Sequence, residues 1–113
     1  MNKTAVQKHN EVCLLLDYYG SLLTERRQQI LRLYYEEDMS LSEIAELLQI
    51  TRQAVHDNMQ QGISQLEEYE TKLRSIERDT LLIDQIQNLL ENDLYSDPQK
   101  VKKELIRLQN IIL

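Results

Sequence analysis

Five polar side chains of types that suit nucleic-acid recognition stand within ten residues of one another: Thr51, Arg52, Gln53, His56 and Gln60. If a helix begins here, they occupy its first turns, where duplex-reading proteins place the residues that contact base edges. Arg52 could bind guanine and Gln53 adenine through two hydrogen bonds each. Three further cations that could bind phosphates precede them: Arg26, Arg27 and Arg32. These eight residues are the candidate nucleic-acid or partner-binding site.

Catalytic and metal-binding residues are scarce. The sequence has two histidines and one cysteine, and the one pair at helical spacing, His9 and Cys13, offers two ligands where a closed zinc site needs four. Glu36, Glu37 and Asp38 are consecutive, as in a solvated charge run, rather than opposed across a cleft. The two glycines are isolated, so no phosphate-binding loop is indicated. We therefore predict no enzymatic activity, no cofactor and no metal.

The charge balance argues against a general affinity for polyanions. Thirteen Lys and Arg against nineteen Asp and Glu give a net charge of −6, and residues 24–62 hold four arginines against seven acids. A field of this sign repels phosphate and costs a nucleic-acid complex orders of magnitude in affinity. Two interpretations stay open: a motif that packs or binds protein, and one that contacts nucleic acid through a local patch.

The elements that would position these residues begin at two capping signals. The Ser40 hydroxyl and the Glu43 carboxylate are spaced to cap a helix start reciprocally. Thr51 can cap the next helix in the same way. Only Gln49 and Ile50 lie between the two helices, and a connection this short makes them cross at a large angle. The sequence therefore predicts a helix-turn-helix.

The rest of the chain is also predicted to be helical, because two glycines and one proline rarely interrupt it. We expect helices over Thr4–Tyr19, from Thr24 to near Glu36, and from the Asp97-Pro98 start signal onward. An apolar stripe predicts one long helix from Thr51 to about Glu91. Its positions are Val55, Met59, Ile63, Leu66, Leu73, Ile76, Ile83 and Leu90.

These elements indicate one all-α protein, since 113 residues favour a single cooperative unit. We expect residues 1–64 to form the helix-turn-helix lobe and residues 65–113 a helical extension. The stripe is longer than a small core needs, which indicates an extended helix pair within or between chains, and we expect a homodimer. The N-terminal residues lack the apolar stretch of a signal peptide, and the apolar runs are too short to span a membrane. We expect a soluble, cytoplasmic protein.

Several segments resemble a known family. Residues 23–35, 41–45 and 50–55 resemble the promoter-reading region 4 of sigma factors. The segment 15–24 (LLDYYGSLLT), the run 52–58 (RQAVHDN) and residues 66–70 (LEEYE) resemble the bacterial YlxM family more closely. The likeness spans about residues 10–78. Two positions depart from the sigma pattern: Gln49 stands where glycine is common, and Asn58 fills an apolar slot.

The resemblance implies a function that the residues alone do not. YlxM proteins are small helix-turn-helix proteins linked to the signal recognition particle pathway by gene proximity to its targeting GTPase. It therefore implies a non-enzymatic accessory protein of co-translational targeting, which binds the particle's GTPase or its RNA. One alternative is a transcriptional regulator that binds duplex DNA through Arg52, Gln53 and His56, and another is a purely structural dimerisation module. The chain is too short for the polymerase-binding region of a sigma factor, so transcription initiation is set aside.

Overall fold

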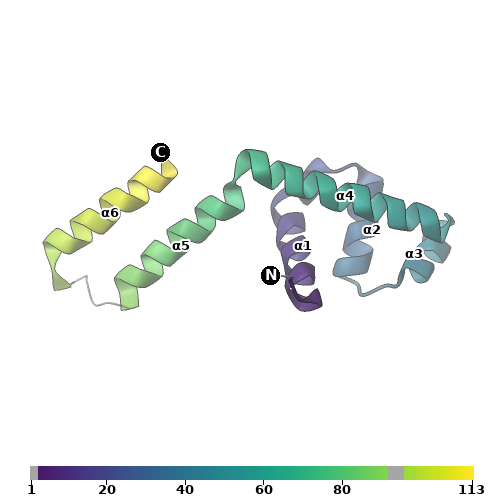
Figure 1. Ribbon diagram of the computed structural model, residues 1–113, viewed down its shortest axis with the longest axis horizontal. Helices are drawn as coiled ribbons and strands as arrows, with labels where there is room; N and C mark the ends of the chain where they lie inside the picture. Colours follow the sequence, from purple (N-terminus) through teal and green to yellow (C-terminus); the bar gives the residue numbers. More distant parts are fainter. Residues whose placement is uncertain (1–2, 92–95) are drawn as a thin grey trace. The chain divides into compact units, whose positions relative to one another are not determined.

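The computed structural model describes residues 3–91 and 96–113 and is all-α over these ranges (Figure 1). The chain divides into two compact units, residues 1–73 and 74–113. The boundary expected at residue 64 lies inside a helix, and the first unit continues nine residues further. None of the described helices is long and apolar enough to cross a lipid bilayer.

The first two helices begin at side-chain caps. Helix α1, Ala5–Tyr19, starts after Thr4, whose hydroxyl accepts a hydrogen bond from the backbone of Gln7, while the Gln7 side chain accepts one from the Thr4 backbone. A short 3-10 turn, η1 (Gly20–Leu22), follows. Helix α2, Glu25–Tyr35, begins after Thr24, whose hydroxyl accepts from the Arg27 backbone. The predicted bounds of both helices are therefore confirmed.

The helix-turn-helix is formed by α3, Leu41–Leu48, and α4, Arg52–Leu73. Ser40 and Glu43 make the predicted capping box, with N···O distances of 3.0 and 3.1 Å, and Thr51 accepts from the Ala54 backbone at 3.0 Å. Gln49 ends α3 in the left-handed backbone region, φ 57°. That conformation costs a non-glycine residue about 1 kcal/mol. The Gln49 side chain also donates to the Glu46 carbonyl at 2.8 Å.

The hydrophobic core described by the structure belongs to the first unit. Helix α4 packs against α1, α2 and α3, and Figure 1 shows it running across them. Over the described ranges, the buried apolar side chains all lie between residues 12 and 66: Val12, Leu15, Leu16, Tyr19, Leu23, Ile30, Leu31, Ile44, Val55, Met59 and Leu66. Gly62 of α4 lies so close to α2 that a Cβ there would stand 2.7 Å from Leu31 Cδ1.

The second unit is a pair of helices, α5 (Ser75–Glu91) and α6 (Pro98–Ile112), packed against each other. The Asp97-Pro98 start is confirmed, because the Asp97 carboxylate accepts from the Gln99 backbone at 3.0 Å. Among the described residues of this unit, no apolar side chain is buried. Several of its apolar side chains, among them Leu82, Leu89 and Leu108, are half-buried.

The prediction of one helix from Thr51 to about Glu91 is wrong. Helix α4 ends at Leu73, and Arg74 takes a left-handed backbone, φ 54°, before α5 begins. One left-handed residue ends the regular rotation of successive side chains, so the apolar stripe does not continue on one face. Three of its predicted members are more than half exposed: Leu73 (55%), Ile83 (53%) and Leu90 (64%).

Candidate nucleic-acid interface

The side chains singled out at the start of α4 share an exposed surface. Arg52, Gln53, His56 and Gln60 are all exposed on its first turns. Thr51 is exposed as well, but its hydroxyl is occupied as the helix cap. The helix-turn-helix therefore brings the five predicted residues of this group together, with their backbone held by the cap and by the buried Val55 one turn in.

Asp57 lies in the middle of this surface and binds its neighbours. Gln53 Nε2 donates to Asp57 Oδ1 at 2.9 Å, and His56 Nδ1 lies 3.7 Å from the same oxygen. Two consequences follow. A base or phosphate contacted by Gln53 must compete with this carboxylate, and the negative charge opposes any phosphate that approaches the first turns of α4.

The three arginines of α2 do not lie in equivalent surroundings. Arg27 donates to Gln65 Oε1 at 2.7 Å and to Gln61 Oε1, so its guanidinium joins α2 to the middle of α4. Arg32 pairs with Glu36, with N···O distances of 2.6 and 3.2 Å. Arg26 is exposed and makes no ion pair within the described ranges. Of the three, Arg26 is the one whose charge is uncommitted.

Acidic residues surround the first helix of the motif. Residues 33–51 contain five acids and no Lys or Arg. Hydrogen bonds from the Ser40 backbone and side chain lower the pKa of the Glu43 carboxyl below its ordinary value. In duplex-reading proteins the first helix crosses the phosphate backbone. The acids on α3 therefore oppose that mode of docking.

Sequence reasoning missed the surface hollows beside α3. One hollow, of about 360 Å³, is lined by Met39, Glu43, Glu46 and Leu47. A second, of about 320 Å³, shares two of these side chains; its lining is His9, Tyr34, Asp38, Met39, Ser40 and Glu43. The lining residues come from α1, the end of α2, the segment between α2 and α3, and α3 itself, so spacing along the chain gave no signal for the hollows.

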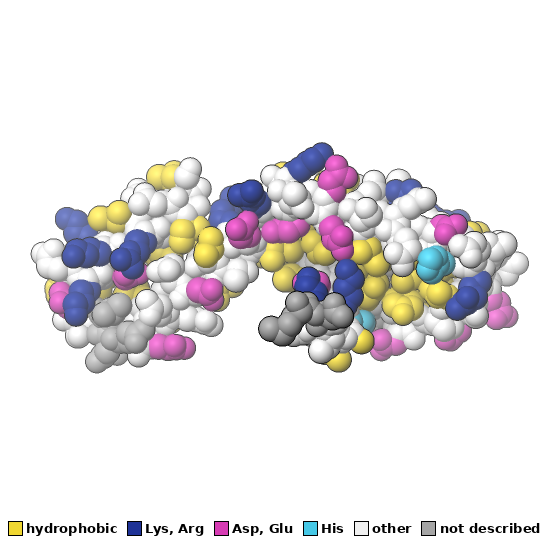
Figure 2. Space-filling model, in the orientation of Figure 1, with side chains coloured by type: hydrophobic (Ala, Val, Ile, Leu, Met, Phe, Trp, Pro, Cys, Tyr) yellow, Lys and Arg dark blue, Asp and Glu magenta, His cyan; other side chains and the backbone are white. Residues whose placement is uncertain are grey.

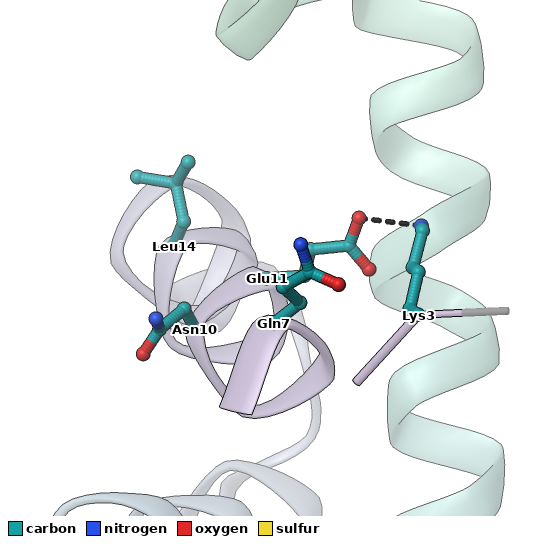
Figure 3. A pocket seen from close by; sticks show the side chains of 5 residues that line it. All are labelled: Lys3, Gln7, Asn10, Glu11 and Leu14. Carbon is teal, nitrogen blue, oxygen red and sulfur yellow. Dashed lines mark hydrogen bonds and ion pairs between the residues drawn. The ribbon is translucent and has the colours of Figure 1, made fainter. Parts of the chain in front are cut away.

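A further hollow of about 390 Å³ lies along the outer face of α1 (Figure 3). Its lining is Lys3, Gln7, Asn10, Glu11 and Leu14. The Lys3 ammonium is ion-paired with Glu11, and Leu14 points away from that pair. The Gln7 amide is already bound in the cap of α1. Because these polar groups already have partners, the hollow is a poor site for a charged ligand.

The groups with catalytic potential are held in inert surroundings. Burial, followed by the charges of Asp17, Glu36 and Asp38, raises the pKa of the Cys13 thiol, which disfavours the nucleophilic thiolate. The His9 ring packs on Tyr35 with centroids 5.1 Å apart. Within the described ranges, no group of three metal-ligating side chains converges.

Known proteins are similar to this chain over the helix-turn-helix and most of the second unit. Residues 6–107 match the model of the UPF0122 family, described as "Putative helix-turn-helix protein, YlxM / p13 like". A UPF0122 protein of Listeria innocua is 39% identical over 108 residues, covering 93% of this chain and 97% of its own length. One from Desulforamulus reducens is 53% identical over 68 residues, 60% of this chain and 58% of the relative. One from Clostridium botulinum is 43% identical over 81 residues, 72% and 74% of the two chains.

Proposed function

Because the chain belongs to the UPF0122 family of YlxM/p13-like helix-turn-helix proteins, we propose that it is a cytoplasmic, non-enzymatic accessory protein of the bacterial signal recognition particle pathway. It acts by binding the particle's RNA or its targeting GTPase through the helix-turn-helix lobe. The observation that carries the proposal is the exposed polar start of α4, where Arg52, Gln53 and His56 lie on helix turns whose Val55 is buried in the core.

The charge distribution favours a limited contact over a long duplex interface. Glu43 and Glu46 are exposed on α3, where a duplex reader needs phosphate contacts. The exposed polar start of α4 is a narrower surface, and it fits the splayed bases of an RNA loop, which proteins read through stacking and hydrogen bonds at single nucleotides. Arg52 and Gln53 supply the hydrogen bonds and His56 a ring that can stack. Arg26 is the cation we assign to a flanking phosphate.

A direct test measures binding of the full chain to fluorescently labelled signal recognition particle RNA at low salt. We expect Arg52→Ala to weaken binding by about 1 to 3 kcal/mol, the value of one specific base contact. The matched control is Arg78→Ala in α5, an arginine that is also exposed and lies outside the candidate site, and it should leave affinity within about twofold. If Arg52→Ala has no effect on the RNA, the proposed surface is wrong.

The same assay separates the targeting role from the transcriptional one. A regulator would bind duplex DNA more tightly than the RNA, and its affinity would fall steeply with salt. Binding of the purified GTPase to the full chain tests the protein partner, again with Arg52→Ala against Arg78→Ala. Failure of both the RNA and the GTPase to bind at low salt would contradict the role in targeting.

We also propose that the α5–α6 pair mediates homodimerisation. Apolar side chains are exposed on both helices, among them Ile86, Leu90, Leu105 and Ile112. Residues 75–91 carry a net charge of −3 and residues 98–112 a net charge of +3, and Figure 2 shows Lys and Arg side chains gathered over α6. A two-fold-related copy would cover these apolar positions, and because the charges of α5 and α6 cancel within each pair, they do not oppose its approach.

Sedimentation tests this self-association. The full chain should sediment as a dimer at tens of micromolar, and Leu90→Glu should shift it to monomer, because an exposed position tolerates the charge in one chain but not in a covered interface. Leu47→Glu is the control, a leucine of similar exposure in the first unit. A wild-type protein that remains monomeric would contradict the proposal.

A further inference from the structure

The two hollows beside α3 adjoin each other, because Met39 and Glu43 line both. Together we call them the α3 groove. Its apolar surface comes from Leu47, which is 58% exposed, from the half-buried Met39 and, at the far end, from Tyr34. The side chains of α3 that face the core are different ones, with Ile44 fully buried. Leu47 is therefore exposed without contributing to the core of the lobe.

Three acids line the groove together with these apolar side chains. Asp38 precedes α3, Glu43 lies on its first turn, and Glu46 stands beside Leu47. Glu36 follows α2 nearby in sequence and is paired with Arg32. Among the residues that line the groove, His9 is the one side chain that can carry positive charge, and its ring packs on Tyr35. The groove thus combines accessible apolar side chains with an excess of negative charge.

We propose that the α3 groove docks a cationic amphipathic segment of a partner protein. An apolar side chain of that segment packs between Met39 and Leu47, and its Lys or Arg residues pair with Asp38, Glu43 and Glu46. Such a surface fits recognition of a helix in a groove, where apolar anchors supply affinity and charges set orientation and on-rate. This site is separate from the start of α4, so it does not depend on the nucleic-acid role.

Charge complementarity selects this occupant over two others. A nucleic acid would bring phosphates against three carboxylates. A second copy of the chain could offer α6, which is cationic, but α6 already packs against α5, whose net charge of −3 offsets its own +3. A cationic segment of another protein brings no phosphates to the carboxylates and is not already packed against α5.

The test uses the full chain and a labelled 18-residue peptide of Leu and Lys with leucines at i, i+3 and i+4 spacing. A scrambled peptide of identical composition controls for nonspecific attraction to an acidic protein. We expect Leu47→Gln and Glu46→Gln each to weaken binding of the patterned peptide by tenfold or more. Both positions are exposed, so neither variant removes a core contact. Glu68→Gln, an exposed acid on α4, is the matched control and should change affinity by less than twofold.

Three results would overturn the proposal. The first is equal binding of the patterned and scrambled peptides, and the second is binding that Leu47→Gln leaves unchanged. The third is tenfold tighter binding, also lost in Leu47→Gln, of a peptide copied from residues 98–112, which would assign the groove to a second copy of the chain. Arg52→Ala should leave peptide binding unchanged, so failure here and failure of the nucleic-acid proposal are distinguishable.

Discussion

Gly62 gives a quantitative test of how α4 packs on α2. Replacing it with alanine places a Cβ 2.7 Å from Leu31 Cδ1, about an ångström closer than van der Waals contact. Leu31 is fully buried and cannot swing into solvent. Adding a methyl group to a packed core typically costs about 1 to 3 kcal/mol, whereas alanine gains about 1 kcal/mol over glycine in a helix interior. We expect Gly62→Ala to lower the free energy of unfolding by about 1 kcal/mol.

The sign of this effect should reverse when Leu31 is shortened. Leu31→Ala alone should cost about 2 to 5 kcal/mol, because it leaves a cavity in the core. In that background the clash is absent and the helix propensity gain remains, so Gly62→Ala should stabilise the protein by about 1 kcal/mol. The two substitutions are thus coupled by roughly 2 kcal/mol, well above the error of a double-mutant cycle.

Urea unfolding of the wild type, the two single variants and the double variant, followed by circular dichroism, measures this coupling. Ser64→Ala, at an exposed position of α4, is the control for helix propensity alone, and its small gain should be the same with or without Leu31→Ala. If Gly62→Ala also changes stability by the same amount in both backgrounds, α2 and α4 do not approach at this point and the packing described for the core is wrong.

Three further predictions concern acidity, autonomy and reactivity. The pKa of Glu43 is lowered in the folded protein, so its ionised carboxylate stabilises the fold above its ordinary pKa, and this stabilisation is lost as pH falls through the lowered value. In Glu43→Gln, the free energy of unfolding measured against pH should lack this acid-dependent loss. A chain ending at Leu73 should unfold cooperatively and stay monomeric in sedimentation, since it retains every apolar residue described as buried; loss of folding would refute this. Cys13 should react with iodoacetamide at pH 8 more slowly in the folded protein than in urea, because its pKa is raised; equal rates would count against its described environment.

The parts of the fold that the sequence predicted correctly are those set by local chemistry. The cap at Ser40 depends on a partner three residues away, and the start at Asp97-Pro98 on the next two residues. Such signals survive in any tertiary setting. The helix-turn-helix followed from them, because only two residues separate the end of α3 from Thr51.

The interruption at Arg74 had no such local signal. A left-handed residue within a helical pattern is usually announced by glycine or asparagine, and this position holds arginine. The apolar stripe therefore suggested one helix across it. The consequence was an incorrect assignment of faces, because Leu73, Ile83 and Leu90 were expected on one continuous stripe that the break at Arg74 interrupts.

In the candidate site, too, the features set by neighbouring residues could be predicted and those set by tertiary packing could not. The grouping of Arg52, Gln53 and His56 follows from their positions on one helix. The role of Arg27 could not be predicted, because its partners Gln61 and Gln65 are 34 and 38 residues away and meet it only once α2 packs on α4. For the α3 groove, the sequence showed the acidic residues, but it did not show that Leu47 beside them is exposed.

The measurement that tests the central claim most directly is an NMR titration of the isotopically labelled full chain with signal recognition particle RNA. The claim is that the start of α4 is the binding surface of the lobe. We predict that the largest chemical-shift changes fall on Arg52, Gln53, His56 and Gln60, with Arg26 also affected. Changes confined to α5 and α6, with the first turns of α4 unperturbed at saturation, would contradict it.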